Sequence, residues 1–156
     1  MPLREAASGD IPKLARHHRE MFEEVWQAIG KAVESAKADM LEEAYSRKLG
    51  AQLNNSCKAW VIEHKGDIFA SGAISIVSYV PTPLDPNSDV AYLHSMFTDK
   101  GYRGRRCASR IIEQALDYCR ARGIKRVMLF ASDAGRPLYE HVGFSPVPNM
   151  MRLILE

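Results

Sequence analysis

The stretch FTDKGYRGRRCASRII, residues 97–112, places a run of arginines between a strand-like segment and a helix-like segment. A strand that turns into a helix start leaves several backbone N–H groups unpartnered, and the helix dipole adds partial positive charge, so such a corner attracts anions. Its charged and small residues are Arg103, Gly104, Arg105, Arg106 and Ala108. The arginines add formal charge, and the small residues let a phosphate approach the backbone. On charge alone, a pyrophosphate cradle, a solvated charge run and a small nucleic-acid patch remain open.

Apolar periodicity on both sides of this stretch predicts helices and strands that succeed one another in one domain, residues 1–156. Asp10 is the expected N-cap of the first helix. The predicted helices cover residues 11–29, 36–49, 105–122 and 133–144. The predicted strands cover residues 2–7, 59–64, 68–80, 90–98, 125–132 (buried and parallel) and, as closing strands, 145–155. In the second helix, Met40, Ala44 and Leu49 are expected to face the core.

Composition limits the classes of function. The 156 residues are 46% apolar and 26% charged, which suits one domain with a substantial core. The net charge of +2 is too small to predict nucleic-acid or membrane binding, and no apolar run is long enough to span a bilayer, so a cytoplasmic protein is expected. The three cysteines lack metal-ligand spacing and are expected to be free thiols, and no metal site is predicted.

Two motifs resemble those of the GNAT superfamily of N-acyltransferases. YRGRRCASRIIEQAL, residues 102–116, resembles the acyl-CoA-binding motif, which reads Arg or Gln, two residues, Gly, one residue, then Gly or Ala. Arg103 takes its first position and Ala108 its last, whereas Arg106 replaces the middle glycine. DAGRPLYEHVGF, residues 133–144, resembles the second signature of the family, whose positions are filled by Gly135, Leu138, Tyr139, Glu140, Gly143 and Phe144.

The resemblance implies an α/β, three-layer fold: a mixed, largely antiparallel sheet of about seven strands with a splayed parallel pair in the middle and helices on both faces. It implies acetyl-CoA as co-substrate. Backbone N–H groups would hold the pyrophosphate, and the splayed strand edge would pair with the pantetheine arm. The implied cofactor-binding residues are Met96, Phe97, Thr98, Arg103, Gly104, Arg105, Arg106, Cys107, Ala108, Ser109 and Ser132. Ser132 stands where many members carry an asparagine.

The same resemblance makes Tyr139 the candidate acid that protonates the leaving thiolate. A base must take the proton of the attacking amine, and His94 has a suitable intrinsic pKa. Strand alternation puts Tyr92, His94 and Met96 on one face, toward the splay. His94 and a water are both open as the base. The remaining histidines are expected at helix surfaces or a hairpin end: His17, His18, His64 and His141.

The predicted function is transfer of an acetyl group from acetyl-CoA to a primary amine by direct attack. The alternative is a CoA-binding regulatory or degenerate domain, suggested by Arg106 and Ser132; a nucleic-acid module is the weakest option. Because a helix start needs only ordinary dihedrals, we expect a right-handed helical backbone at Arg106, whose side chain would then only add a cation. The expected partner is a small-molecule or peptide amine, without nucleic acid or membrane. The resemblance puts the acceptor site under the first two helices and the proline loop, residues 81–89, and the closing strands could pair across a homodimer.

Overall fold

A five-stranded mixed sheet in the order β1-β2-β3-β4-β5 forms the centre of the computed structural model, which describes residues 1–156. All neighbouring strands are antiparallel except the parallel pair β4 and β5. The elements are β1 (Leu3–Glu5), α1 (Ile11–Ala28), α2 (Ser35–Gln52), β2 (Cys57–His64), β3 (Asp67–Ser78), β4 (Asp89–Thr98), α3 (Cys107–Ala121), β5 (Arg126–Met128) and α4 (Arg136–Val142), with one-turn 3₁₀ helices η1 (Ser8–Asp10) and η2 (Lys100–Tyr102).

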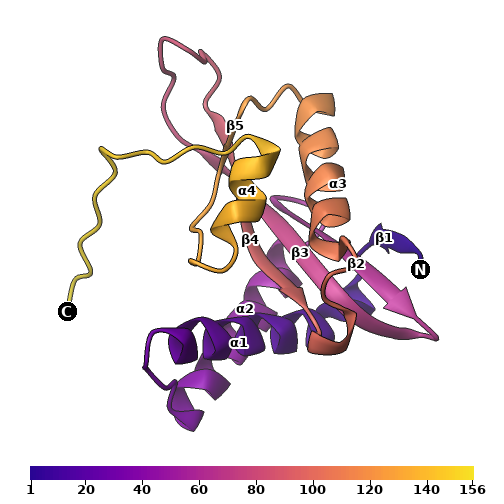
Figure 1. Cartoon of the computed structure of the whole chain (residues 1–156). Helices are drawn as coiled ribbons and strands as arrows, with labels where there is room; N and C mark the ends of the chain where they lie inside the picture. The colour runs from indigo at the N-terminus through magenta and orange to yellow at the C-terminus, as the bar shows by residue number, and fades with distance from the viewer.

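Helices cover both faces of the sheet, as the sequence predicts (Figure 1). On one face, Leu14 of α1 and Leu49 of α2 pack against the strands. On the other face, Ile111 and Ile112 of α3 are fully buried against β2, β3 and β4, and α4 adds Leu138 to this side. The apolar stripes of α1 and α3 therefore produce the three-layer arrangement. None of the helices combines the length and the apolarity needed to cross a membrane.

A β-bulge in β4 reverses the alternation of its side chains. Ser95 has a left-handed backbone, with φ at 58°. The register passes from Ala73 opposite His94 to Ser71 opposite Phe97, so β4 holds one residue more than β3 here. His94 points to α2, whereas Met96 packs on the α3 side. The prediction that Tyr92, His94 and Met96 share a face is therefore wrong for Met96.

The parallel pair separates soon after it forms. The ladder joins residues 90–92 of β4 to residues 126–128 of β5 and stops there, although β4 continues to Thr98. The β4 edge beyond Tyr92 that would face β5 is consequently unpaired. This is the splay that the sequence resemblance implies, and it opens next to the start of α3.

The last segment differs from the prediction, which is wrong about the closing strands. Residues 145–156 form no strand and extend away from the body of the protein (Figure 1). The sheet has five strands rather than about seven, and β5 is an edge strand. No strand pairs with the outer edge of β5, which is only partly buried, and Phe130 is 71% exposed. The strand predicted at residues 125–132 is therefore parallel, as expected, but it is shorter than predicted and not buried.

Two helix details also differ. Asp10 is the N-cap residue of α1, as predicted, but its carboxylate makes no capping hydrogen bond: it accepts the N–H of Ala7 and pairs with Arg4 at 2.7 Å instead. In α2, Met40 and Ala44 are exposed, and the buried face comprises Ala38, Tyr45 and Leu49. The apolar content of α2 was too evenly spread to indicate which face packs on α1.

Candidate active site

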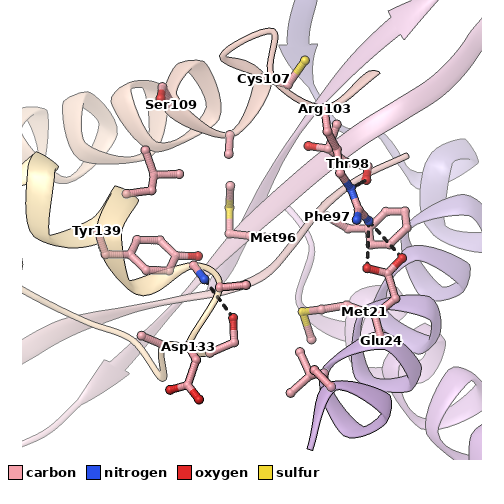
Figure 2. A pocket seen from close by; sticks show the side chains of 18 of the residues that line it. Met21, Glu24, Met96, Phe97, Thr98, Arg103, Cys107, Ser109, Asp133 and Tyr139 are labelled. Atoms are coloured by element: carbon pink, nitrogen blue, oxygen red, sulfur yellow. Dashed lines mark hydrogen bonds and ion pairs between the residues drawn. The ribbon is translucent and has the colours of Figure 1, made fainter. Parts of the chain in front are cut away.

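A cavity of about 980 Å³ lies where the splay of β4 and β5 meets the start of α3. Its walls come from α1, the end of β4, the turn into α3, the loop before α4, and α4 itself (Figure 2). Its volume is at the upper end of the range for small-molecule and cofactor sites. Segments far apart in the sequence therefore form one site.

The turn into α3 presents unpartnered backbone donors to this cavity. None of the N–H groups from Gly104 to Ser109 donates a hydrogen bond to another residue. Gly104 and Arg106 both have left-handed backbones, with φ at 79° and 61°. Left-handed residues within a turn help successive N–H groups to converge, and the dipole of the 15-residue helix α3 adds positive charge. This arrangement has the chemistry to accept an anion.

Arg106 is the N-cap residue of α3 and does not have helical dihedrals. The prediction of an ordinary helical backbone there is therefore wrong. A side chain at left-handed φ costs about 1–2 kcal/mol relative to the ordinary conformation, and the cost is absent for glycine. The departure from the glycine of the motif thus strains the backbone as well as adding a cation.

The Arg103 guanidinium does not point at the anion-binding turn. Its Nη2 contacts both carboxylate oxygens of Glu24 at 2.8 and 2.9 Å, and its Nε donates to the carbonyl of Thr98 at 2.8 Å. Its guanidinium also lies 5.7 Å from the centre of the Phe97 ring. Arg103 therefore ties α1 to the end of β4, as Figure 2 shows.

The cavity gathers most of the residues that the sequence resemblance names. The predicted site residues along its walls are Met96, Phe97, Thr98, Arg103, Gly104, Arg106, Cys107, Ala108, Ser109, Ser132 and Tyr139. Arg105 is not among the lining residues, because its guanidinium lies over the Tyr102 ring at 5.3 Å. His94 is also outside the lining.

Tyr139 of α4 borders the cavity (Figure 2), and Ser132 lines it from the loop before α4. The Ser132 hydroxyl accepts the N–H of Gly135 at 3.2 Å, which fixes the loop that precedes α4. A Cβ at Gly135 would lie 3.2 Å from the Tyr139 ring, so the small residue allows the ring to lie against the loop. Burial raises the pKa of Tyr139 above its usual range, so its hydroxyl is protonated at neutral pH.

His94 belongs to a buried polar network beside the bulge. Its Nε2 lies 2.7 Å from the hydroxyl of Ser75, and its Nδ1 lies 2.8 Å from the hydroxyl of Ser95. The same Ser95 hydroxyl lies 2.7 Å from His18 Nδ1. Burial, with smaller contributions from Lys48 and His18, lowers the pKa of His94 to about 4. His94 is therefore neutral at pH 7.

The prediction of surface positions is wrong for two histidines of α1. His17 is 1% exposed, and the ring of His18 stacks on Tyr45 at 3.9 Å between centroids. Both lie on the face of α1 that packs on the sheet and α2. His18 lies four residues after Leu14, on the apolar stripe of this helix, and that spacing is the better guide to its position.

Sequence reasoning put the first helix over the acceptor site and named Ser132, but it named no other residue of the two cavity walls that α1 and the loop before α4 form. The α1 wall consists of Met21, Glu24, Val25, Ala28 and Ile29, and the loop wall includes Ala131, Asp133 and Ala134. The spacing of Met21, Val25 and Ile29 was a usable signal, since this end of the stripe runs beyond the sheet. Neither α2 nor the proline loop lines the cavity. That loop is held at the opposite end of β4, where Arg126 of β5 pairs with buried Asp85 at 2.8 Å (Figure 1).

Comparisons with known proteins agree with this architecture. A model of the acetyltransferase (GNAT) family matches residues 12–144. A mycothiol acetyltransferase from Beutenbergia cavernae is 32% identical over 91 residues, which are 56% of this chain and 28% of that protein, so the chain spans less than a third of that relative.

Two solved structures share the fold. A predicted acetyltransferase from Clostridium acetobutylicum, solved with acetyl-CoA, is 24% identical with a TM-score of 0.84, over 98% of this chain and 95% of that one. A GCN5-related N-acetyltransferase from Ralstonia eutropha JMP134 is also 24% identical, with a TM-score of 0.86 over 98% and 97% of the two chains.

Proposed function

This chain belongs to the GNAT acetyltransferase family, and from that membership we propose that it transfers the acetyl group of acetyl-CoA to a primary amine. The amine attacks the thioester directly while both substrates are bound. The observation that carries the proposal is the juxtaposition of two unpaired backbone surfaces in one cavity: the N–H groups of residues 104–109 and the free β4 edge. A cofactor with a diphosphate and an amide-bearing arm has the chemistry to use both.

The diphosphate of acetyl-CoA would accept hydrogen bonds from the N–H groups of residues 104–109. These groups need no rearrangement, since no other residue uses them. Arg106 borders the same turn and would add a cation near the phosphates. The pantetheine arm would extend along Met96–Thr98, where its amides replace the strand that β5 does not supply.

Tyr139 is the proposed acid. As the new N–C bond forms and the C–S bond breaks, the sulfur gains negative charge, and the phenol hydroxyl would donate its proton to the thiolate. The raised pKa of Tyr139 keeps the donor protonated at neutral pH. Both Tyr139 and Met96 border the cavity, so the thioester would lie between α4 and the bulge of β4.

The amine proton needs an acceptor, because a primary amine with pKa ~10.4 is deprotonated in only about one part in a thousand at pH 7. We assign this task to a water at the bulge, with His94 as a positioning residue that acts through the Ser95 hydroxyl. Two facts support a relay rather than direct contact: His94 does not line the cavity, and its pKa of about 4 makes it a weak base. The proton would then pass from the amine nitrogen to this water and on to bulk solvent, while the neutral network holds the water in place.

The acceptor is proposed to be a small-molecule or peptide amine that enters along α1. Met21, Val25 and Ile29 make this wall apolar, and its one carboxylate, Glu24, is already paired with Arg103. An amine with an apolar portion fits this wall better than a polycation does. The relative described above is named a mycothiol acetyltransferase, and this name does not decide the acceptor of this chain.

The alternative function is acyl-CoA binding without turnover. It is favoured by the strained cation at Arg106 and by Ser132, whose hydroxyl is occupied by the N–H of Gly135. One experiment separates the two functions: thermal stabilisation by acetyl-CoA is measured first, and thiol release is then followed with a panel of primary amines. Stabilisation with amine-dependent thiol release supports the transferase. Stabilisation without release by any amine supports the alternative, and no stabilisation contradicts both.

A further inference from the structure

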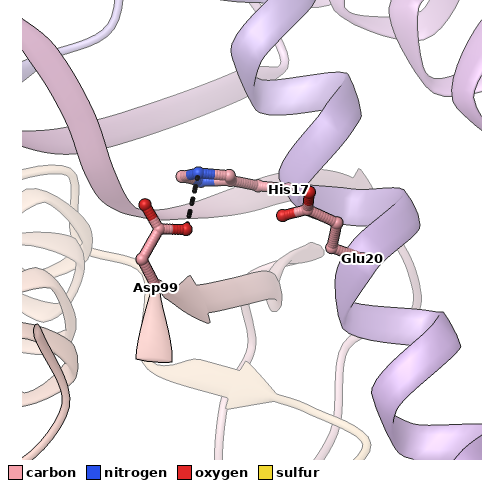
Figure 3. A group of neighbouring side chains, drawn as sticks. All are labelled: His17, Glu20 and Asp99. Carbon is pink, nitrogen blue, oxygen red and sulfur yellow. Dashed lines mark ion pairs between the residues drawn. The ribbon is translucent and has the colours of Figure 1, made fainter. Parts of the chain in front are cut away.

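A buried histidine and two carboxylates form a second cluster of chemically active side chains, outside the cavity. His17 and Glu20 lie three residues apart on α1, and Asp99 follows the end of β4 (Figure 3). One ligand atom from each residue lies within 4.8 Å of the others. None of the three lines the acetyl-CoA cavity proposed above.

His17 directs an unsatisfied nitrogen into this cluster. The side chain is 1% exposed, and its Nε2 has no hydrogen-bond partner. The nearest acidic atom, Asp99 Oδ1, is 3.8 Å away, which is too far for a hydrogen bond. A buried polar nitrogen without a partner costs about 1–3 kcal/mol, so its presence calls for a ligand.

The other ring nitrogen is arranged to leave Nε2 available. His17 Nδ1 lies 2.7 Å from the hydroxyl of Ser71, a fully buried residue of β3. When Nδ1–H donates to this hydroxyl, Nε2 carries the lone pair that a metal needs, and such a partner commonly orients metal-binding histidines. The Phe97 ring, 4.7 Å from His17 between centroids, holds the imidazole from the side.

The two carboxylates lie in a partly buried setting that disfavours their charge. Burial and the charge of Asp99 raise the pKa of Glu20, and burial raises the pKa of Asp99, to which Asp67 adds a repulsive charge. Three cations partly offset this: Lys13 acts on both carboxylates, Arg16 on Glu20 and Arg103 on Asp99. Lys13 is itself 3.5 Å from Asp67. A bound dication would relieve the repulsion between the carboxylates.

We propose that His17, Glu20 and Asp99 bind a divalent transition-metal ion, with Zn²⁺ as the best fit and water in the remaining position. One imidazole nitrogen and two carboxylate oxygens suit zinc better than magnesium or calcium, which prefer oxygen ligands alone. In a tetrahedral site with ligands about 2.0–2.2 Å from the zinc ion, the ligand atoms lie about 3.3–3.6 Å from one another. The three ligand atoms lie within 4.8 Å of one another here, so zinc binding requires the half-buried side chains of Glu20 and Asp99 to move inward by up to about 1.5 Å.

The site would join α1 to the end of β4, directly before the turn that leads to the anion-binding N–H groups. The Arg103–Glu24 pair ties the same two elements one turn further along α1. The metal therefore has a structural role: it holds in place the helix that forms one wall of the cavity. This role does not depend on the proposed acetyl transfer.

The test is a zinc titration of the untagged, chelator-treated protein by calorimetry, with thermal unfolding measured with and without ZnCl₂. We expect one zinc ion per chain, a higher Tm with zinc, and much weaker binding of MgCl₂. Glu20→Gln and Asp99→Asn are each expected to weaken zinc binding at least tenfold. Glu23→Gln is the matched control, since it removes a carboxylate from the same helix outside the cluster, and it should bind zinc as the unmodified chain does.

A further readout assigns the nitrogen. In ¹⁵N spectra of the imidazole groups, zinc should shift Nε2 of His17 and leave the surface residue His141 unchanged. The proposal is overturned if zinc does not bind with defined stoichiometry, if both carboxylate variants bind it as tightly as the unmodified chain, or if only surface histidines shift. Circular dichroism of Glu20→Gln verifies that this half-buried substitution leaves the fold intact.

Discussion

Replacing Arg106 with glycine changes the backbone and the charge of the anion-binding turn at once, and a second variant separates the two effects. Arg106→Gly removes the cation and the Cβ, whereas Arg106→Ala removes the cation and keeps the Cβ at φ 61°. Arg106 forms no ion pair within the protein, so neither variant leaves a partner charge unpaired. Arg105→Ala is the control, because it removes an adjacent cation that does not line the cavity.

The backbone effect follows from the left-handed dihedrals. A Cβ at this left-handed position costs about 1–2 kcal/mol in the folded state, so glycine removes that cost. Glycine also has more conformational freedom in the unfolded chain, which offsets about 0.5–1 kcal/mol of the stabilisation. Arg106→Gly should therefore raise the free energy of unfolding by about 0.5–1 kcal/mol over Arg106→Ala. For a chain of this size the corresponding rise in Tm is about 1–4 °C.

The loss of the charge is expected to change the Kd for acetyl-CoA rather than the stability of the protein. A solvent-exposed cation near a phosphate contributes about 0.5–1 kcal/mol, or roughly a two- to fivefold change in Kd. Arg106→Ala should weaken acetyl-CoA binding by that factor, and the loss should shrink at high salt. Arg105→Ala should bind as the unmodified chain does. The reasoning is refuted if Arg106→Gly has the lower Tm of the two variants, since the turn would then not hold a left-handed residue.

Other features of the structure predict further results. Gly72→Ala should lower the free energy of unfolding by about 1–3 kcal/mol in denaturant titrations, because the added methyl group overlaps Met96 in the core; an unchanged midpoint would contradict the bulge geometry. Tyr139→Phe should lower kcat by about 100-fold or more and leave Kd for acetyl-CoA unchanged, whereas equal turnover would exclude the acid role. The folded pKa of His94, about 4, is below the ordinary value of 6.5, so the unfolded chain binds more protons between these pH values and stability falls as the pH is lowered through that window. His94 alone should lower the free energy of unfolding at pH 5 by about 2 kcal/mol relative to pH 7. In chemical unfolding, His94→Gln should reduce the difference in unfolding free energy between pH 7 and pH 5 by that amount. Leu153 is 81% exposed in the apolar last segment, so the homodimer remains a prediction that Leu153→Arg tests: light scattering should show a dimer become a monomer, and a monomer in both cases would count against pairing through this segment.

Local patterns in the sequence were enough to predict most elements and the main anchor of the site. The apolar stripes of α1 and α3 depend only on residue spacing. Gly66 forms the turn between β2 and β3, and Gly123 ends α3, each with a positive φ that glycine adopts readily. The turn from β4 into α3 was predictable for the same reason: its small residues and the helix start both lie within residues 97–112. Two motifs at the right separation then indicated the family, which the match over residues 12–144 establishes.

Long-range contacts decided what those patterns left open. The bulge at Ser95 depends on the register between β3 and β4, and it moves Met96 to the face opposite His94 although the sequence alternates regularly. Closing strands at residues 145–155 were expected from β-forming residues, but strands exist only where a partner edge is paired, and none pairs with them here.

The sequence by itself thus determined the helices, the turn with its free N–H groups, and the family, because each depends on residues close together in the chain. Only the tertiary structure decided which side chains meet. It brought Glu24 to Arg103 across 79 residues, and it buried His17 beside Asp99 with an unpartnered nitrogen. Such pairs form when α1 packs on the sheet, and no local pattern reports the distance between them.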